Sequence, residues 1–146
     1  MLKNIPEIIS PEFLMVLAEM GHGDEIVIGD GNFPSESMGA NAIVIRADGH
    51  GVPEILDAVL KLIPLDAYVE EPVALMEVVK GDPVVPVIWD EYKKIIEGHE
   101  PKNNKIKHME RFEFYERAKN AYAIVATGEK AIYANVILKK GVVING

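Results

Sequence analysis

The sequence has no cysteine, although its length of 146 residues is ample for a folded domain. Disulfide bridges, thiolate nucleophiles and cysteine-ligated metals are therefore excluded. No apolar run reaches the ~20 residues that span a bilayer, and the first residues lack the basic and then apolar layout of a secretory signal. We expect a cytoplasmic protein that makes no contact with membranes.

Motifs of several common enzyme classes are also missing. The sequence has no P-loop, no G-x-G-x-x-G fingerprint, no H-E-x-x-H zinc motif and no G-x-S-x-G elbow. Its histidines show no spacing typical of metal ligands, so we expect neither a metal nor a cofactor. A metal site built from distant histidines and aspartates stays open at this point. The four histidines are His22, His50, His99 and His108.

Basic residues are outnumbered, with 15 lysines and arginines against 23 aspartates and glutamates and a net charge of −8. A field of this sign repels a phosphate backbone and argues against nucleic-acid binding. One local basic group is too small for a nucleic-acid footprint, but it could meet a polar substrate. Its members are Lys102, Lys105, Lys107 and Arg111.

The spacing of apolar residues predicts a single α/β domain over residues 1–146. Helices and strands alternate through the first two-thirds, which favours a mostly parallel central sheet flanked by helices. The last two strands look like a hairpin, and the polar stretch 99–107 is predicted to be a surface loop. Helices are expected around 11–18, 55–63, 88–96 and 112–119, and strands at 26–28, 43–45, 73–79, 122–126 and 136–138.

The densest polar cluster is Gly21-His22-Gly23-Asp24, followed by Asp30. A histidine between glycines lies in approachable backbone, and imidazole titrates near neutral pH. The same residues could equally form a simple turn between a helix and a strand. This segment therefore supports two interpretations, one catalytic and one purely structural.

Two further clusters lie in the last third of the chain. Arg111 and Tyr115 are four residues apart and share one face of a predicted helix, which could also be an ordinary salt-bridged surface. Tyr133 and Asn135 point the same way in an extended segment. Both can donate and accept hydrogen bonds, which suits a sugar hydroxyl, although polar residues also decorate strand edges.

Several blocks carry a resemblance that covers nearly the whole chain in order. They include SPEFLMVLAEMGHGDEIVIGD at 10–30, IRADG at 45–49, RFEFYERA at 111–118, AIVATGE at 123–129 and LKKGV at 138–142. Together they resemble the family of D-ribose pyranases and L-fucose mutarotases. Residues 80–108 fit this family poorly, so the resemblance implies no function for them.

The resemblance implies an α/β fold and a homo-oligomer, commonly a decameric ring, with active sites between neighbouring subunits. It assigns His22 as the proton donor, and Asp30 and Arg111 as the acid and the base that bind the sugar. The segment of Tyr133, Ala134 and Asn135 would line the pocket from an adjacent subunit.

Two positions qualify these assignments. Ala134 stands where fucose-specific members often have glycine, so its methyl group is expected to narrow the pocket. His108 is a weaker candidate, because the ribose branch has a histidine just before the position of Arg111.

The implied activity is an isomerase that interconverts the α and β anomers of L-fucose by general acid–base catalysis, without a cofactor. The alternatives are a D-ribose pyranase, which interconverts pyranose and furanose forms, a non-catalytic sugar-binding accessory protein, and an oligomeric scaffold. One distance is difficult to reconcile, because a fully extended chain would separate His22 from Asp30 by about 26 Å. Either the glycine-rich segment curls back over the strand, or the two residues serve sites on different subunits.

Overall fold

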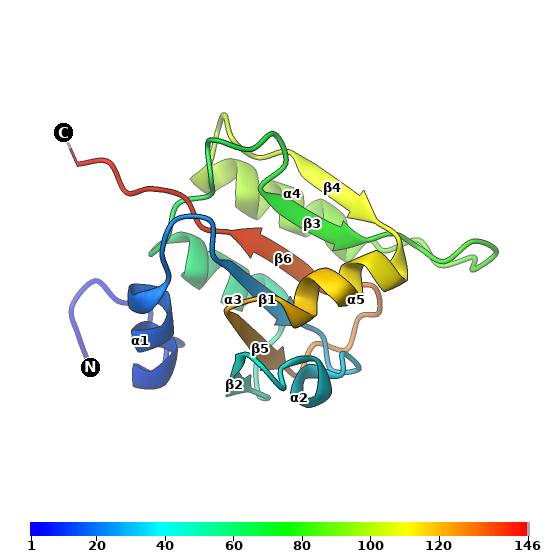
Figure 1. Ribbon diagram of the computed structural model, residues 1–146, viewed down its shortest axis with the longest axis horizontal. Helices are drawn as coiled ribbons and strands as arrows, with labels where there is room; N and C mark the ends of the chain where they lie inside the picture. Colours follow the sequence, from blue (N-terminus) through cyan, green and yellow to red (C-terminus); the bar gives the residue numbers. More distant parts are fainter. Residues whose placement is uncertain (146) are drawn as a thin grey trace.

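A single six-stranded sheet with helices on both faces organises the computed structural model, which describes residues 1–145 (Figure 1). The strand order is β2-β5-β1-β6-β3-β4, and β6 runs antiparallel to both of its neighbours while the other pairs are parallel. The predicted mostly parallel sheet is confirmed. The strands are β1 (Glu25–Gly29), β2 (Ile43–Ala47), β3 (Val73–Met76), β4 (Ile106–Met109), β5 (Ala123–Thr127) and β6 (Val136–Lys139). The helices are α1 (Pro11–Glu19), α2 (Ser35–Met38), α3 (Val52–Leu60), α4 (Ile88–His99) and α5 (Arg111–Lys119).

Side chains of the sheet alternate between two cores, as the pleat of a strand requires. Ile26 and Ile28 of β1 pack with α1, α3 and α4, whereas Val27 packs with α5 on the opposite face. Figure 1 shows α5 in front of the sheet and α3 and α4 behind it. Each of these fully buried side chains stabilises the fold by roughly 1.5–3 kcal/mol, and both sheet faces are covered.

The last two strands do not form the predicted hairpin. β5 and β6 lie on opposite sides of β1, so the connection at 128–135 crosses the carboxyl end of that strand. The crossing is held against β1 by a hydrogen bond from the Gly31 N–H to the Glu129 carbonyl, 2.8 Å long. This topology carries residues 133–135 over the end of β1.

The predicted loop at 99–107 is partly wrong, because Ile106 begins β4 at the edge of the sheet. Lys107 and His108 of this edge strand are exposed, so its polar surface conceals it from a search for apolar runs. β3 also ends at Met76, three residues before its predicted end. The chain then leaves the sheet as a long loop, residues 77–87, which projects at the right of Figure 1.

Candidate active site

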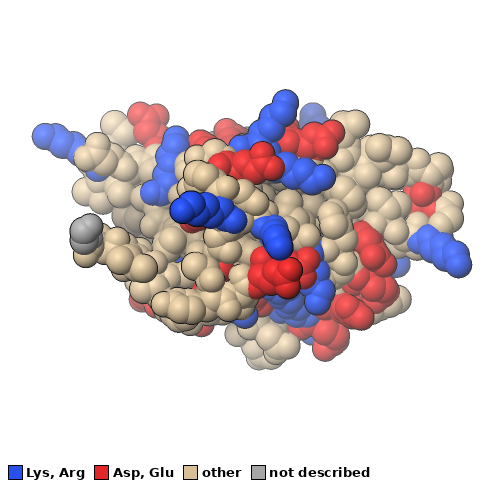
Figure 2. Space-filling model, turned by 90° about the horizontal axis from the view of Figure 1, so that it is seen from above, with Lys and Arg blue, Asp and Glu red and all other residues tan. Residues whose placement is uncertain are grey.

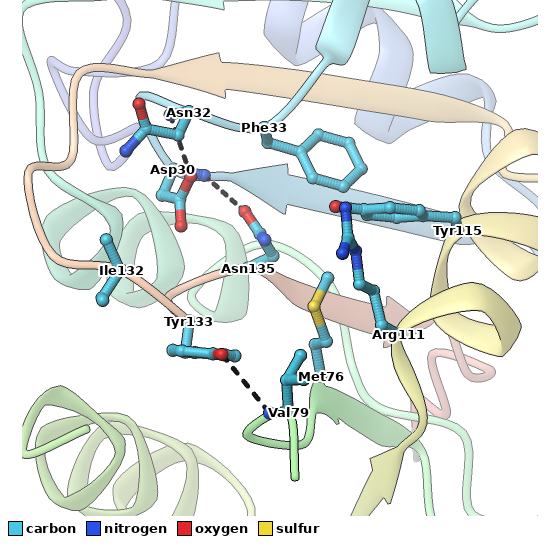
Figure 3. A pocket seen from close by; sticks show the side chains of 10 residues that line it. All are labelled: Asp30, Asn32, Phe33, Met76, Val79, Arg111, Tyr115, Ile132, Tyr133 and Asn135. Carbon is cyan, nitrogen blue, oxygen red and sulfur yellow. Dashed lines mark hydrogen bonds between the residues drawn. The ribbon is translucent and has the colours of Figure 1, made fainter. Parts of the chain in front are cut away.

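A cavity of about 200 Å³ lies at the carboxyl ends of β1 and β3 (Figure 3). Its size fits a ligand smaller than the drug-sized molecules bound by pockets of roughly 300–1,000 Å³. One part of the wall is polar and the other is apolar or aromatic. The polar residues are Asp30, Asn32, Arg111, Tyr133 and Asn135; the others are Phe33, Met76, Val79, Tyr115 and Ile132.

Asp30 follows β1 directly and is only 5% exposed. One of its carboxylate oxygens accepts the Asn32 N–H at 3.0 Å, and the other accepts the Ala134 N–H at 3.3 Å. Its own N–H donates to Oδ1 of Asn135 at 2.7 Å. Burial raises the pKa of Asp30, and the backbone N–H donors only partly oppose that rise. The carboxyl is thus rigidly held with acceptor capacity left for substrate hydroxyls.

Two side chains of α4 hold the crossing segment, residues 128–135, in place. Trp89 donates its indole N–H to the Tyr133 carbonyl at 2.7 Å, and Tyr92 donates its hydroxyl to the Ala134 carbonyl at 2.7 Å. Tyr133 has a φ of 56°, a left-handed conformation that costs a non-glycine residue about 1 kcal/mol or more. Strain of this kind persists where surrounding contacts enforce it, often at functional sites.

Ala134 does not line the cavity, contrary to the expectation that its methyl group narrows the pocket. Its side chain is fully buried in the core shared with α1, α3 and α4. The residue instead contributes its backbone N–H to Asp30. The methyl group of this residue therefore belongs to the core and not to the cavity wall.

Arg111 opens α5 immediately after β4, because Glu110 caps the helix by accepting the Phe112 and Glu113 N–H groups at 2.9 and 3.2 Å. The guanidinium carbon lies 5.6 Å from the ring centroid of Tyr115, within reach of a cation–π contact. Within residues 1–145 no carboxylate forms an ion pair with Arg111. Its donors are free to bind a substrate.

His22 lies at the other end of β1. The Asp24 N–H donates to the Gly21 carbonyl at 3.2 Å, and Gly23 has a φ of +86°, the geometry of a type II turn that glycine favours. The Gly23 N–H donates to the Lys140 carbonyl at 2.8 Å. This pairing ties the turn to the chain after β6, so it does not curl back over the strand toward Asp30.

Asp66 is the partner of His22, with Nε2 2.9 Å from Oδ1. Burial raises the pKa of Asp66, but hydrogen bonds from the Tyr68 N–H and from His22 outweigh it and leave the pKa below its ordinary value. An ionised Asp66 can only accept a hydrogen bond, which assigns the hydrogen of the neutral His22 ring to Nε2 and the lone pair to Nδ1. A carboxylate in this position orients an imidazole and stabilises its charged form.

This histidine–aspartate pair is partly open to solvent, since the His22 side chain is 46% exposed. The ring of Tyr68 lies 5.2 Å from that of His22 and is itself exposed. Sequence reasoning missed Asp66 because it stands 44 positions from its partner, with no local pattern to connect them.

The pair and the cavity are separated within one chain. The five residues of β1 alone place His22 about 16 Å or more from Asp30, at roughly 3.3 Å per residue. Asp30, Arg111, Tyr133 and Asn135 line one cavity within a single chain, whereas the resemblance implied that the 133–135 segment comes from an adjacent subunit. His22 is not among the residues of this cavity. Tyr115 also lines the cavity, and its spacing four residues after Arg111 was the available signal.

Other sequence features lie away from the cavity. His108 is exposed on β4 and its ring contacts that of Trp89, with centroids 5.0 Å apart and the planes tilted by 52°. Within the local basic group, Lys105 pairs with Glu70, and Figure 2 shows basic and acidic side chains intermixed over its view. Among the described residues, no three His, Asp or Glu side chains gather closely enough to hold a metal ion. In the same part of the chain, no helix has the length and apolar character needed to cross a membrane.

Comparisons with a family model, with known sequences and with solved structures all match this chain to the same family. The family described as RbsD / FucU transport protein matches residues 3–143. The fucose mutarotase of Homo sapiens is 53% identical over 145 residues, which cover 97% of this chain and 94% of that protein. The crystal structure of FucU from Bifidobacterium longum is similar with a TM-score of 0.95 and 59% identity, covering 97% of this chain and all 100% of that one. The fucose mutarotase from Streptococcus pneumoniae, solved in complex with L-fucose, has a TM-score of 0.92 and 54% identity, with coverages of 98% and 100%.

Proposed function

The chain belongs to the RbsD / FucU family, and on this basis we propose that it is an isomerase that interconverts the α and β anomers of L-fucose. The observation that carries the proposal is the convergence of Asp30, Arg111, Tyr133 and Asn135 on one small cavity. Relatives that share more than half of its residues over nearly the whole chain are fucose mutarotases.

The composition of the cavity suits a deoxy sugar. A carboxylate, a guanidinium, a phenol and an amide can together accept from and donate to several hydroxyls of a neutral sugar. Phe33, Met76 and Ile132 offer apolar surface that the methyl group of L-fucose would bury. D-ribose has no methyl group, so this wall favours fucose over the ribose alternative.

The proposed reaction requires two coordinated proton transfers. The ring oxygen gains a proton while the anomeric hydroxyl loses one, the bond between the anomeric carbon and the ring oxygen breaks, and an aldehyde forms. Rotation about the adjacent carbon–carbon bond and reclosure on the other face return both protons, so no atom is gained or lost. General acid–base catalysis of this kind contributes roughly 10²–10⁴-fold.

We assign His22 as the proton donor and Asp66 as the group that orients it. Nδ1 of His22 has no hydrogen-bond partner within residues 1–145, so its lone pair would take up the proton of the anomeric hydroxyl, and the imidazolium would then donate that proton to the ring oxygen. The Asp66 carboxylate would stabilise the imidazolium while it holds the proton. Asp30, Arg111, Tyr133 and Asn135 would bind the hydroxyls.

Since the two groups lie at opposite ends of β1, we propose that each active site combines the cavity of one subunit with the His22–Asp66 pair of the next. Such a head-to-tail contact is heterologous, and it forms a ring when the rotation between successive subunits closes. A decamer, implied by the family resemblance, is the predicted size, and light scattering on the purified protein measures it. A cytoplasmic location also stays a prediction, which cell fractionation tests.

Proton NMR saturation transfer between the two anomeric signals of L-fucose tests the function directly. We expect exchange that depends on the protein and is weaker with D-ribose. Faster exchange with D-ribose would favour the pyranase alternative. Binding of L-fucose without exchange would indicate a sugar-binding accessory protein. Absence of both binding and exchange would favour the remaining alternative, an oligomeric scaffold.

A further inference from the structure

The 77–87 loop touches the cavity through one tight turn. The Asp82 N–H donates to the Val79 carbonyl at 3.0 Å, and Gly81 has a φ of +92°. This is the geometry of a type II turn, in which the third residue needs a positive φ and glycine supplies it. Val79, the first residue of the 79–82 turn, lines the cavity.

The Asp82 carboxylate connects this turn to the crossing segment. One oxygen accepts the Val84 N–H at 3.2 Å, which stabilises the loop itself. The other accepts the hydroxyl of Tyr133 at 2.6 Å. The same hydroxyl accepts the Val79 N–H at 3.3 Å, a contact drawn in Figure 3. The hydroxyl of Tyr133 therefore forms hydrogen bonds with both the first and the last residue of the 79–82 turn.

These contacts use up most of the hydrogen-bonding capacity of the phenol. A phenol has one hydrogen to donate and two lone pairs to accept with. The hydrogen of Tyr133 is committed to Asp82, and one lone pair is taken by Val79. The hydrogen bond to Asp82 also raises the pKa of Tyr133, so the phenol keeps its proton. One lone pair remains for a ligand in the cavity.

From this geometry we propose that Asp82 is a positioning residue, which holds the Tyr133 phenol as a hydrogen-bond acceptor toward the substrate. The bound sugar must then present a hydroxyl hydrogen at this point of the wall. The inference deepens the proposed function and rests on it. Sequence reasoning had carried no function onto residues 80–108, so Asp82 is an addition to the site.

A double-variant cycle tests the proposal. Asp82→Asn keeps the size of the side chain but leaves one acceptor oxygen for two donors, the Val84 N–H and the Tyr133 hydroxyl. We expect a KM for L-fucose exchange that is roughly tenfold higher, with a much smaller change in kcat, because ground-state binding is lost. Tyr133→Phe should give a similar change, and the double variant should be no worse than Tyr133→Phe alone. Multiplying effects in the double variant would overturn the proposal.

Asp90→Asn is the matched control, because Asp90 is exposed in the first turn of α4, and the hydrogen bonds of Tyr133 are made with Val79, Trp89 and Asp82. It should leave KM unchanged. Thermal melting of each variant establishes that the fold is retained. If Asp82→Asn lowers kcat and leaves KM unchanged, Asp82 does not act through substrate binding and the proposal fails.

A second readout separates this proposal from the proposed function. Ultraviolet difference titration of the wild-type protein against Tyr133→Phe follows the ionisation of this one phenol. Loss of the carboxylate in Asp82→Asn should move that ionisation to lower pH, because the hydrogen bond that raises the pKa of Tyr133 is lost. An unmoved titration refutes the role of Asp82 whatever the activity. Absent L-fucose exchange together with a moved titration refutes the mutarotase and keeps the Asp82–Tyr133 link.

Discussion

The two ends of β1 are built for different tasks. At its carboxyl end, the residues that follow β1, together with residues of β3, α5, the 77–87 loop and the 128–135 crossing, enclose a cavity with several hydrogen-bonding groups. At its amino end, His22 and Asp66 form a half-exposed pair beside Tyr68. The cavity at the first end has no histidine among its lining residues, whereas the histidine at the second end is half-exposed to solvent. In the proposed reaction, substrate binding and proton transfer are therefore divided between the two ends.

The two aspartates sharpen this contrast. Asp30 and Asp66 are similarly buried, at 5% and 2% exposure, yet the pKa of Asp30 is raised and that of Asp66 is lowered. Burial raises the pKa of Asp30 and outweighs the backbone N–H donors around its carboxylate. At Asp66 the effect of burial is outweighed by the hydrogen bonds from the Tyr68 N–H and from His22. The balance between burial and neighbouring donors therefore decides which carboxyl keeps its charge more readily.

The largest effect is expected from His22→Ala, which removes the proton donor and leaves the cavity intact. Anomer exchange should fall roughly 10²–10⁴-fold while L-fucose binding and the oligomer persist. Saturation transfer measures the exchange, and a titration measures the binding. His50→Ala is the control, since His50 pairs with Glu54 on the surface. Unchanged exchange in His22→Ala would remove this end of β1 from the reaction.

Mixing two inactive variants tests whether the two ends meet between subunits. Mixed oligomers of His22→Ala and Arg111→Ala chains should recover about a quarter of wild-type exchange, because that share of heterologous contacts joins two intact halves. Co-expression followed by the NMR assay measures it. Oligomers of each variant alone serve as controls, and mixed oligomers no more active than these would show that the halves do not cooperate across a contact.

Asp66→Asn should have a smaller effect. The amide can still hydrogen-bond to His22 but carries no charge to stabilise the imidazolium, so kcat should fall roughly tenfold with little change in KM. Asp57→Asn is a close control, because Asp57 pairs with His99 at 2.7 Å in the same way elsewhere on the surface. Equal losses in the two variants would argue that the charge acts on the fold as a whole.

The smallest effect concerns stability and pH. Because the pKa of Asp30 is raised, the folded state binds a proton more tightly than the unfolded state, so Asp30 favours folding less as pH rises above the ordinary aspartate pKa. Asp30→Asn is uncharged at every pH and avoids that cost. The melting temperature of the variant minus that of the wild type should be larger at neutral pH than at acidic pH. The exchange activity of the variant should fall. A difference that is constant with pH would contradict the buried charge.

Local sequence patterns determined most of the secondary structure of this protein. Spacings of about 3.6 and 2 residues identify helices and buried strands, because each element must turn one apolar face to a core. Ser10 and Pro11 mark the start of α1, and its N-cap hydroxyl accepts the Phe13 N–H at 3.2 Å. The blocks that resemble the family likewise predicted His22, Asp30 and Arg111 as site residues. Asp30 and Arg111 line the cavity, and His22 does not.

Tertiary structure alone decided where these elements meet. β6 inserts between β1 and β3, and β4 is an edge strand, because strand pairing joins residues as far apart as Ile28 and Val136. The partners of His22, Tyr133 and Asp30 come from 44, 51 and 105 positions away. No periodicity extends over such separations, so only the packing of the sheet brings Asp66 to His22 and Asp82 to Tyr133.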